Sequence, residues 1–117
     1  AAHVEDYIVR LVLATHPGGA FALPITNQYL RWGASPRAAQ TLALAAKVRA
    51  LLEGRYNVSF EDVRRVYLPA LRHRVILNFE AQAEAIDTDH VLLDILEKLP
   101  EKAEERVVTA TVAAATK

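Results

Sequence analysis

Apolar side chains recur every three or four positions along much of the chain, which is the spacing of helices with one buried face. The first such stretch runs from His3 to Thr15 and ends at a Pro-Gly-Gly turn. Residues 17–34 then show no regular period. We expect a long connection there, with at most a short helical turn near Asn27 to Arg31.

The strongest helix signal runs from Pro36 to Glu53, where most residues are good helix formers. Gly54 follows as an expected C-terminal glycine. The large apolar residues of this stretch fall on more than one side of the predicted helix, and they are Leu42, Leu44, Val48, Leu51 and Leu52. We therefore expect this to be the central and most buried helix.

Two later helices carry recognisable starts. Ser59 is a candidate N-cap with an acid, Asp62, at the third helical position, and this helix should run to about Tyr67. The last helix is expected to begin with Thr88 as its cap and to close at Pro100.

The region between these helices is harder to assign. Pro69 should disturb the end of the first helix, with a further turn over 71–74. The apolar run 75–77 is either a buried connector or a short strand, and a strand there could pair with residues 56–58. Residues 79–85 are expected to form a short helix.

Together these elements predict one all-α domain, a small helical bundle with at most a minimal two-stranded β element. Of the 117 residues, 52% are hydrophobic but only 7% aromatic, which favours aliphatic packing of helix on helix. We assign residues 1–100 to the domain and 101–117 to a poorly ordered tail. Because a helix pattern begins almost at Ala1, we expect the chain to be part of a longer protein.

Compartment and membrane signals are few. The absence of cysteine excludes disulfides and fits a reducing compartment. No apolar run approaches the length of a membrane-spanning helix, and no signal peptide is visible.

Charge is unevenly distributed although the net charge is zero. Residues 31–74 contain nine basic and three acidic residues, whereas residues 75–117 contain four basic and nine acidic ones. The basic middle could face phosphates, a nucleic acid or an acidic neighbour. Alternatively, these are solvated helix faces whose charges pair with one another in the fold.

The stretch Ser35-Pro36-Arg37 combines a favourable helix start with an unfavourable charge. Serine at the N-cap and proline at the first helical position are preferred there. A cation in the first turn, however, is opposed by the positive end of the helix dipole. Either Arg37 points into water at a small cost, or it strengthens an anion site at the helix start.

Several motifs in order resemble the C-terminal lid of MoxR-type AAA+ ATPases. The most informative is Gly33-Ala34-Ser35-Pro36-Arg37-Ala38, which resembles their sensor 2 motif. The other matching segments are Tyr7-Ile8-Val9 with Leu11-Val12, Ala43 to Arg55, Tyr56 to Val63, Leu71 to Val75 and Asp87 to Pro100. The resemblance covers about residues 3–100. It departs from the family pattern at Gly18 to Tyr29, which is longer than expected, and after Pro100.

This resemblance implies a helical lid that covers nucleotide held by a larger α/β domain. In that arrangement Arg37 contacts the γ-phosphate of ATP, and Ser35 and Pro36 support its helix start. Arg72 and Arg74 are candidates for contact with a neighbouring subunit or the α/β domain, and the alternative is that they form surface salt bridges. The parent protein would use ATP and Mg²⁺ and act as a chaperone-like remodelling or maturation ATPase in the cytoplasm. Its partners would be its own α/β domain, neighbouring subunits of a hexameric ring and a protein with a von Willebrand factor A domain. Neither a membrane nor a nucleic acid is implied.

Other chemistry is weakly supported. The chain has no G-x-x-x-x-G-K-[ST] phosphate loop and no acidic pair after a hydrophobic strand, so it should not hydrolyse ATP alone. Its histidines lack metal-ligand spacing, and we expect no metal site. A small helical module that binds nucleic acid, or a protein-interaction bundle, remains the alternative function.

Overall fold

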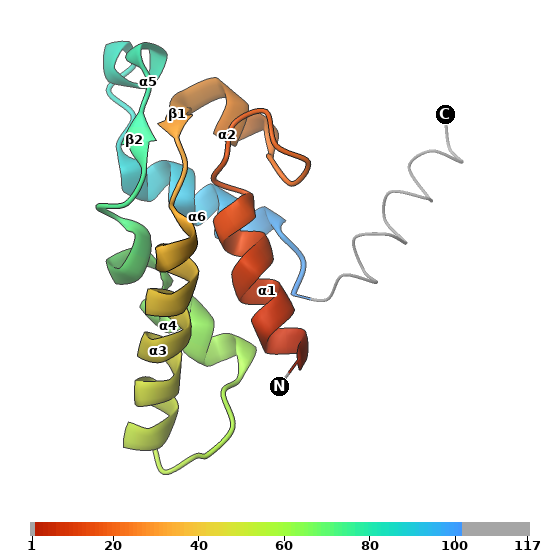
Figure 1. Ribbon diagram of the computed structural model, residues 1–117. Coiled ribbons are helices and arrows are strands. Elements are labelled where there is room, and N and C mark those ends of the chain that lie inside the picture. Colours follow the sequence, from red (N-terminus) through yellow and green to blue (C-terminus); the bar gives the residue numbers. More distant parts are fainter. Residues whose placement is uncertain (1, 102–117) are drawn as a thin grey trace.

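The computed structural model describes residues 2–101, and these form a mainly helical domain with a small sheet (Figure 1). The expected fold class is therefore confirmed. The tail predicted over 101–117 lies outside the described residues except for Glu101.

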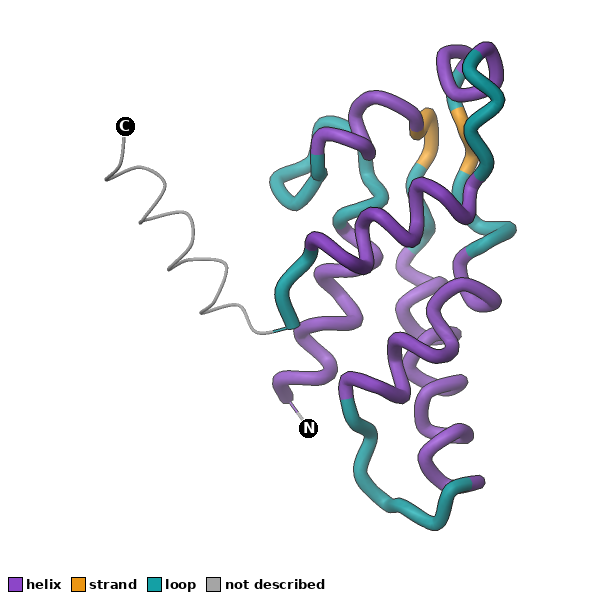
Figure 2. The backbone as a smooth tube through the Cα atoms, turned by 180° about the vertical axis from the view of Figure 1, so that it is seen from behind, coloured by secondary structure: helices purple, strands orange, loops and turns teal. Residues whose placement is uncertain are grey.

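In chain order the described elements are α1 (Ala2–Leu13), α2 (Pro24–Tyr29), β1 (Leu30–Trp32), α3 (Pro36–Leu52), α4 (Phe60–Leu71), β2 (Ile76–Leu77), α5 (Phe79–Ala83) and α6 (Thr88–Lys98). Helices α1, α3 and α4 lie side by side along the long dimension of the molecule, and α6 crosses behind them (Figures 1 and 2). The β1–β2 pair, α2 and α5 gather at the end opposite the α3–α4 loop.

A single aliphatic core joins these elements. Tyr7 of α1 is fully buried, and its ring meets Phe60 edge to face with 5.4 Å between centroids, which joins α1 to the start of α4. Fully buried members from the other helices include Leu42, Val63, Tyr67, Leu71, Val91, Leu92 and Ile95. Val91, Leu92 and Ile95 form the inner face of α6.

Helix α3 is less buried than the sequence analysis expects. Its buried residues form one stripe of mostly small side chains: Ala38, Leu42, Ala46 and Ala50. Leu44 and Leu52 are 65% and 83% exposed, and Val48 and Leu51 are exposed as well. The expectation of burial on several sides is therefore wrong, because full burial is confined to this stripe and the larger apolar residues lie on faces of α3 that the described chain leaves exposed.

The short sheet has a different partner from the one expected. Strand β2 falls within the predicted run 75–77, but it pairs antiparallel with β1, with Leu30 opposite Leu77 and Trp32 opposite Ile76. The expected pairing with residues 56–58 is wrong. The physical reason is that this segment belongs to the α3–α4 loop, where Tyr56 is 90% exposed, whereas Leu30 is buried in the core.

Element boundaries also differ in detail. The expected connection over 17–34 contains α2, which begins with Pro24 at its first turn. Helix α4 continues through Pro69 to Leu71 rather than ending near Tyr67. The cap of α6 is Asp87, whose carboxylate accepts a hydrogen bond from the His90 backbone N–H at 2.8 Å, and not Thr88.

Candidate functional site

The segment that leads from β1 into α3 lies against the end of α1. Ala34 is fully buried, and its N–H donates to Thr15 Oγ1 at 2.9 Å. The preceding Gly33 has no room for a side chain, since a Cβ atom there would lie 2.6 Å from the Thr15 carbonyl oxygen. The start of α3 therefore stands at a fixed place on the domain.

Ser35, Pro36 and Arg37 occupy the expected helix start. Ser35 is at the N-cap with extended backbone angles, and Pro36 is at the first helical position. The Ser35 hydroxyl nevertheless forms no capping hydrogen bond, so the expected side-chain cap is wrong. Its carbonyl oxygen does accept the N–H of Ala38 at 2.9 Å, which begins the helix.

Arg37 is exposed in the first turn of α3. Its side chain makes no hydrogen bond or ion pair with any other residue in the range 2–101. The cationic guanidinium therefore stands at the positive end of the α3 dipole without a compensating acid from this part of the chain. This arrangement leaves it free to bind an external anion.

Arg72 and Arg74 have partners within the fold. Arg72 Nε lies 2.7 Å from Asp89 Oδ1, an ion pair that joins the end of α4 to α6 and raises the pKa of Arg72. Arg74 Nε donates to the carbonyl oxygen of Ala70 at 3.0 Å. Neither arginine is joined to Arg37 by a hydrogen bond or an ion pair within residues 2–101. Their predicted contact with a neighbouring subunit or the α/β domain stays a prediction.

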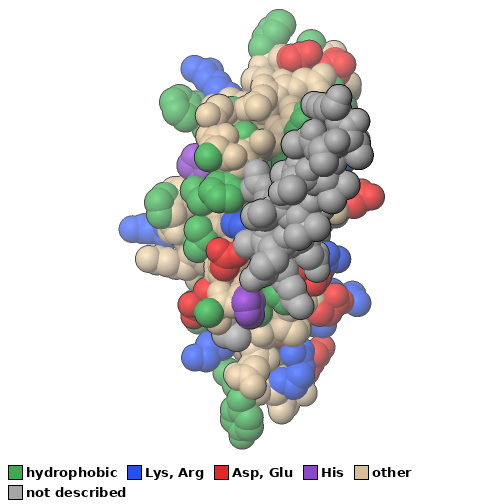
Figure 3. All heavy atoms as spheres, turned by 90° about the vertical axis from the view of Figure 1, so that its right-hand side faces the viewer, with side chains coloured by type: hydrophobic (Ala, Val, Ile, Leu, Met, Phe, Trp, Pro, Cys, Tyr) green, Lys and Arg blue, Asp and Glu red, His purple; other side chains and the backbone are tan. Residues whose placement is uncertain are grey.

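Most other arginines of the basic middle also pair with acids. Ion pairs join Arg49 to Glu53 at 3.1 Å, Arg64 to Glu101 at 3.1 Å and Arg65 to Glu61 at 2.7 Å. Basic and acidic side chains are accordingly interspersed on the face seen in Figure 3. The uneven charge along the sequence is thus largely balanced in space, as the second interpretation of the pattern expects.

The first turn of α4 carries a buried carboxylate that the sequence analysis identifies only as part of a helix cap. Asp62 is fully buried, and Arg55 donates to its two oxygens at 2.6 and 2.7 Å. Ser59 completes a capping box: its N–H donates to Asp62 at 2.8 Å, and its hydroxyl oxygen accepts the Asp62 N–H at 3.3 Å. The hydrogen bonds from Arg55, with those from Ser59, lower the pKa of Asp62 well below its usual range. The sequence predicts the capping box between Ser59 and Asp62, but it does not indicate that Arg55 is the partner of Asp62.

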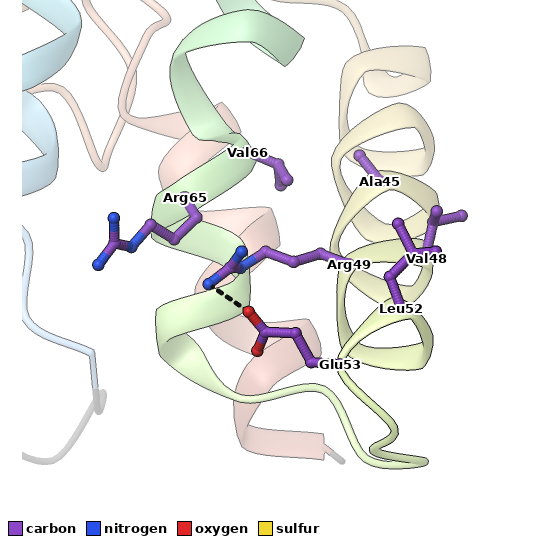
Figure 4. Close-up of a pocket in the computed structure, with 7 residues that line it drawn as sticks. All are labelled: Ala45, Val48, Arg49, Leu52, Glu53, Arg65 and Val66. Carbon is purple, nitrogen blue, oxygen red and sulfur yellow. Dashed lines mark ion pairs between the residues drawn. The ribbon is translucent and has the colours of Figure 1, made fainter.

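A shallow groove of about 430 Å³ runs between α3 and α4 beside this cluster (Figure 4). Its lining combines apolar side chains with the ion pair between Arg49 and Glu53, and comprises Ala45, Val48, Arg49, Leu52, Glu53, Arg65 and Val66. Val48 and Leu52 are also exposed to solvent, so the groove continues the apolar surface of α3.

Two kinds of site are missing from the described part of the chain. Residues 2–101 hold no group of three or more histidine or acidic side chains able to bind a metal ion. None of the helices described is both long enough and apolar enough to cross a membrane.

Comparisons with known proteins give a consistent result. The sequence profile of the AAA lid domain family matches residues 23–95. The chain is 36% identical over 92 residues to Chaperone MoxR1 of Mycobacterium tuberculosis, which covers 79% of this chain and 24% of that protein. It is 42% identical over 78 residues to Protein MoxR of Methylorubrum extorquens, with coverage of 63% and 23%.

A solved structure agrees with the sequence comparisons. It is a putative ATPase from Cytophaga hutchinsonii, and it is similar with a TM-score of 0.80 and 39% identity over 86% of this chain and 30% of that chain. The chain spans about a quarter of the length of the curated relatives it matches. The matched segment contains β1, Gly33 to Arg37 and the helices α2 to α5. The chain therefore belongs to the AAA lid domain family, and within that family it is of the MoxR type.

Proposed function

We propose that this domain is the lid of a chaperone-like MoxR-type AAA+ ATPase, and that Arg37 contacts the γ-phosphate of ATP bound by an α/β domain. The observation that carries this proposal is the state of Arg37. It is exposed at a helix start and has no acidic partner within residues 2–101. A phosphate placed there would compensate both the guanidinium and the helix dipole.

The chemistry of arginine suits this role. A guanidinium is planar, remains charged and can donate two parallel hydrogen bonds to phosphate oxygens. Such charge-assisted bonds contribute about 1.5–3 kcal/mol each. Because ADP lacks the γ-phosphate, this contribution should appear with ATP and largely vanish with ADP. The Mg²⁺ ion would be held by the α/β domain, since residues 2–101 offer no cluster of acidic or histidine ligands for it.

The partners follow from the same arrangement. We propose that the lid packs against its own α/β domain and the neighbouring subunits of a hexameric cytoplasmic ring. Arg37, Leu44, Val48 and Leu51 follow one another at helical spacing along the same face of α3, and the three apolar residues are 47–65% exposed. A surface that brings nucleotide to Arg37 would also cover this apolar face. A partner with a von Willebrand factor A domain rests on the family resemblance alone.

The test is hydrolysis by the full-length protein with Arg37→Ala. We expect steady-state hydrolysis to fall at least about tenfold, the rate equivalent of 1.4 kcal/mol. Affinity for ATP should fall while affinity for ADP changes little. The matched control is Arg31→Ala, which removes another exposed arginine just before the same segment and should leave hydrolysis unchanged. Unchanged hydrolysis with Arg37→Ala would show that Arg37 does not contact the phosphate.

A further inference from the structure

Two consecutive residues in the turn that follows α1, Thr15 and His16, bind the two backbone polar groups of Ala34. Thr15 Oγ1 accepts the Ala34 N–H at 2.9 Å and donates to the Val12 carbonyl oxygen at 2.6 Å. His16 Nε2 lies 2.6 Å from the Ala34 carbonyl oxygen, and because a carbonyl can only accept, the imidazole must donate through Nε2–H. Both backbone polar groups of the buried residue Ala34 are therefore satisfied by the turn that follows α1.

Close packing reinforces these hydrogen bonds. Gly33 lies directly against the backbone of Thr15 and His16, with no space for a Cβ atom. Thr15 is itself fully buried, and His16 is half-buried. Thr15, His16, Gly33 and Ala34 thus form a contact, here called the α1 collar, that joins the end of α1 to the residues just before α3.

The α1 collar fixes the position of the start of α3, a role that a capping side chain usually has. The Ser35 hydroxyl makes no capping bond, so the start of α3 is held in place by the collar, one residue earlier, and by the burial of Ala38. The guanidinium of Arg37 has no hydrogen bond or ion pair with the rest of the described chain to hold it. The direction in which it projects therefore depends on how the first turn of α3 is placed.

We propose that Thr15 and His16 are positioning residues for Arg37. They fix the first turn of α3 so that the guanidinium meets a γ-phosphate at hydrogen-bond distance. This inference rests on the proposed function of Arg37, and neither Thr15 nor His16 touches the nucleotide. Reaction rates are sensitive to such placement, because a displacement of about 1 Å can cost up to roughly a hundredfold in rate.

The experiment uses the full-length protein with His16→Ala, His16→Gln and Thr15→Val, each alone and combined with Arg37→Ala. His16→Ala removes the donor to Ala34, whereas a glutamine amide can still donate from about the position of Nε2. Thr15→Val keeps the side-chain shape but loses both hydrogen bonds. His90→Ala is the matched control, because its side chain is exposed on α6. Hydrolysis, ADP affinity and thermal unfolding are measured for every variant.

We expect His16→Ala to lower kcat about three- to tenfold with ADP affinity unchanged, and His16→Gln to stay within about twofold of the unmodified protein. In the Arg37→Ala background, His16→Ala should cause no further loss, because a positioning residue acts only through the side chain that it positions. Thr15→Val should behave in the same way if it remains folded, and His16→Ala carries the test if it does not.

The inference is overturned if His16→Ala leaves kcat unchanged while Arg37→Ala slows hydrolysis, a result that leaves the proposed function intact. It is also overturned if His16→Ala slows the Arg37→Ala enzyme further, since that loss would be structural. Unchanged hydrolysis with Arg37→Ala alone contradicts the proposed function itself, and the positioning role then has nothing to position.

Discussion

Removal of the Asp62 carboxylate should be among the most destabilising single changes in this domain. Asp62 is fully buried, and its carboxylate accepts two hydrogen bonds from Arg55 and two from Ser59, one from the N–H and one from the hydroxyl. Asp62→Ala removes both acceptor oxygens and with them all of these hydrogen bonds. It also detaches the α3–α4 loop from the first turn of α4, because Arg55 lies on the loop and Asp62 on the helix.

The magnitude can be worked out from these contacts. Loss of the capping box should cost about 1 kcal/mol. Breaking a buried ion pair costs about 3–5 kcal/mol, but an exposed pair is worth only about 0–1 kcal/mol. Because the Arg55 side chain is 38% exposed, the pair lies between these limits. We expect a total of about 2.5 kcal/mol, which for a domain of this size lowers Tm by roughly 10–20 °C.

The assay is thermal and urea unfolding of the chain followed by circular dichroism. The matched control is Glu61→Ala, the preceding residue, whose ion pair with Arg65 at 2.7 Å is exposed on both sides. Such an i,i+4 pair contributes about 0.2–0.5 kcal/mol. A double-mutant cycle with Arg55→Ala isolates the pair itself. If Asp62→Ala costs no more than Glu61→Ala, the account of the buried carboxylate is wrong.

The same carboxylate should make stability depend on pH. The folded-state pKa of Asp62 is lowered, chiefly by its hydrogen bonds from Arg55, and the unfolded value is about 3.9. The unfolded chain therefore binds the proton first as pH falls. The contribution should be complete above about pH 5 and should decline progressively below the unfolded pKa. Asp62→Asn should flatten this acid limb, and a limb of unchanged steepness would contradict the assignment.

The remaining predictions concern the helix start, catalysis and nucleic acid. Gly33→Ala should destabilise the domain by about 1–3 kcal/mol in thermal unfolding, since its Cβ would overlap the Thr15 carbonyl, and a neutral result would contradict the close packing. Arg37→Ala should leave Tm unchanged or slightly higher, because a cation leaves the positive end of α3, and a large loss would make Arg37 structural. The purified chain should show no ATP hydrolysis above background in a phosphate-release assay, and sustained turnover would refute the lid assignment. It should also show no salt-dependent binding to duplex DNA by fluorescence anisotropy, and such binding would favour the nucleic-acid alternative.

The sequence predicted the long helices well because their signals are local. Helix α3 was expected over 36–53 and spans Pro36–Leu52, and the Ser59 cap of α4 is confirmed by its hydrogen bonds. Strand β1 was missed, and α2 was expected only as a short turn near Asn27 to Arg31, because residues 17–34 carry no apolar period. They are stabilised by distant residues instead: Thr26 donates to Ala14, and Leu30 pairs with Leu77.

The residues of the candidate site could likewise be predicted only where their signal is local. Arg37 could be found from the sequence because a cation at a helix start violates a local preference that a single chain reveals. The α1 collar could not be found from the sequence. Thr15 and His16 precede Ala34 by eighteen or more positions, and their residue types do not by themselves indicate a hydrogen bond to its backbone. Positioning of this kind depends on contacts between distant parts of the chain, which a local sequence pattern does not reveal.

The two ends of α3 use arginine in opposite ways. At its C-terminal end Arg49 lies 3.1 Å from Glu53 and 3.4 Å from Asp62, and the helix dipole favours a cation there. At its N-terminal end the dipole opposes Arg37, and no residue of the described chain compensates it. A folded domain gains nothing in stability from an uncompensated cation in that place. The proposed function supplies a compensating charge from outside residues 2–101, because a phosphate group can accept planar, bidentate hydrogen bonds from arginine.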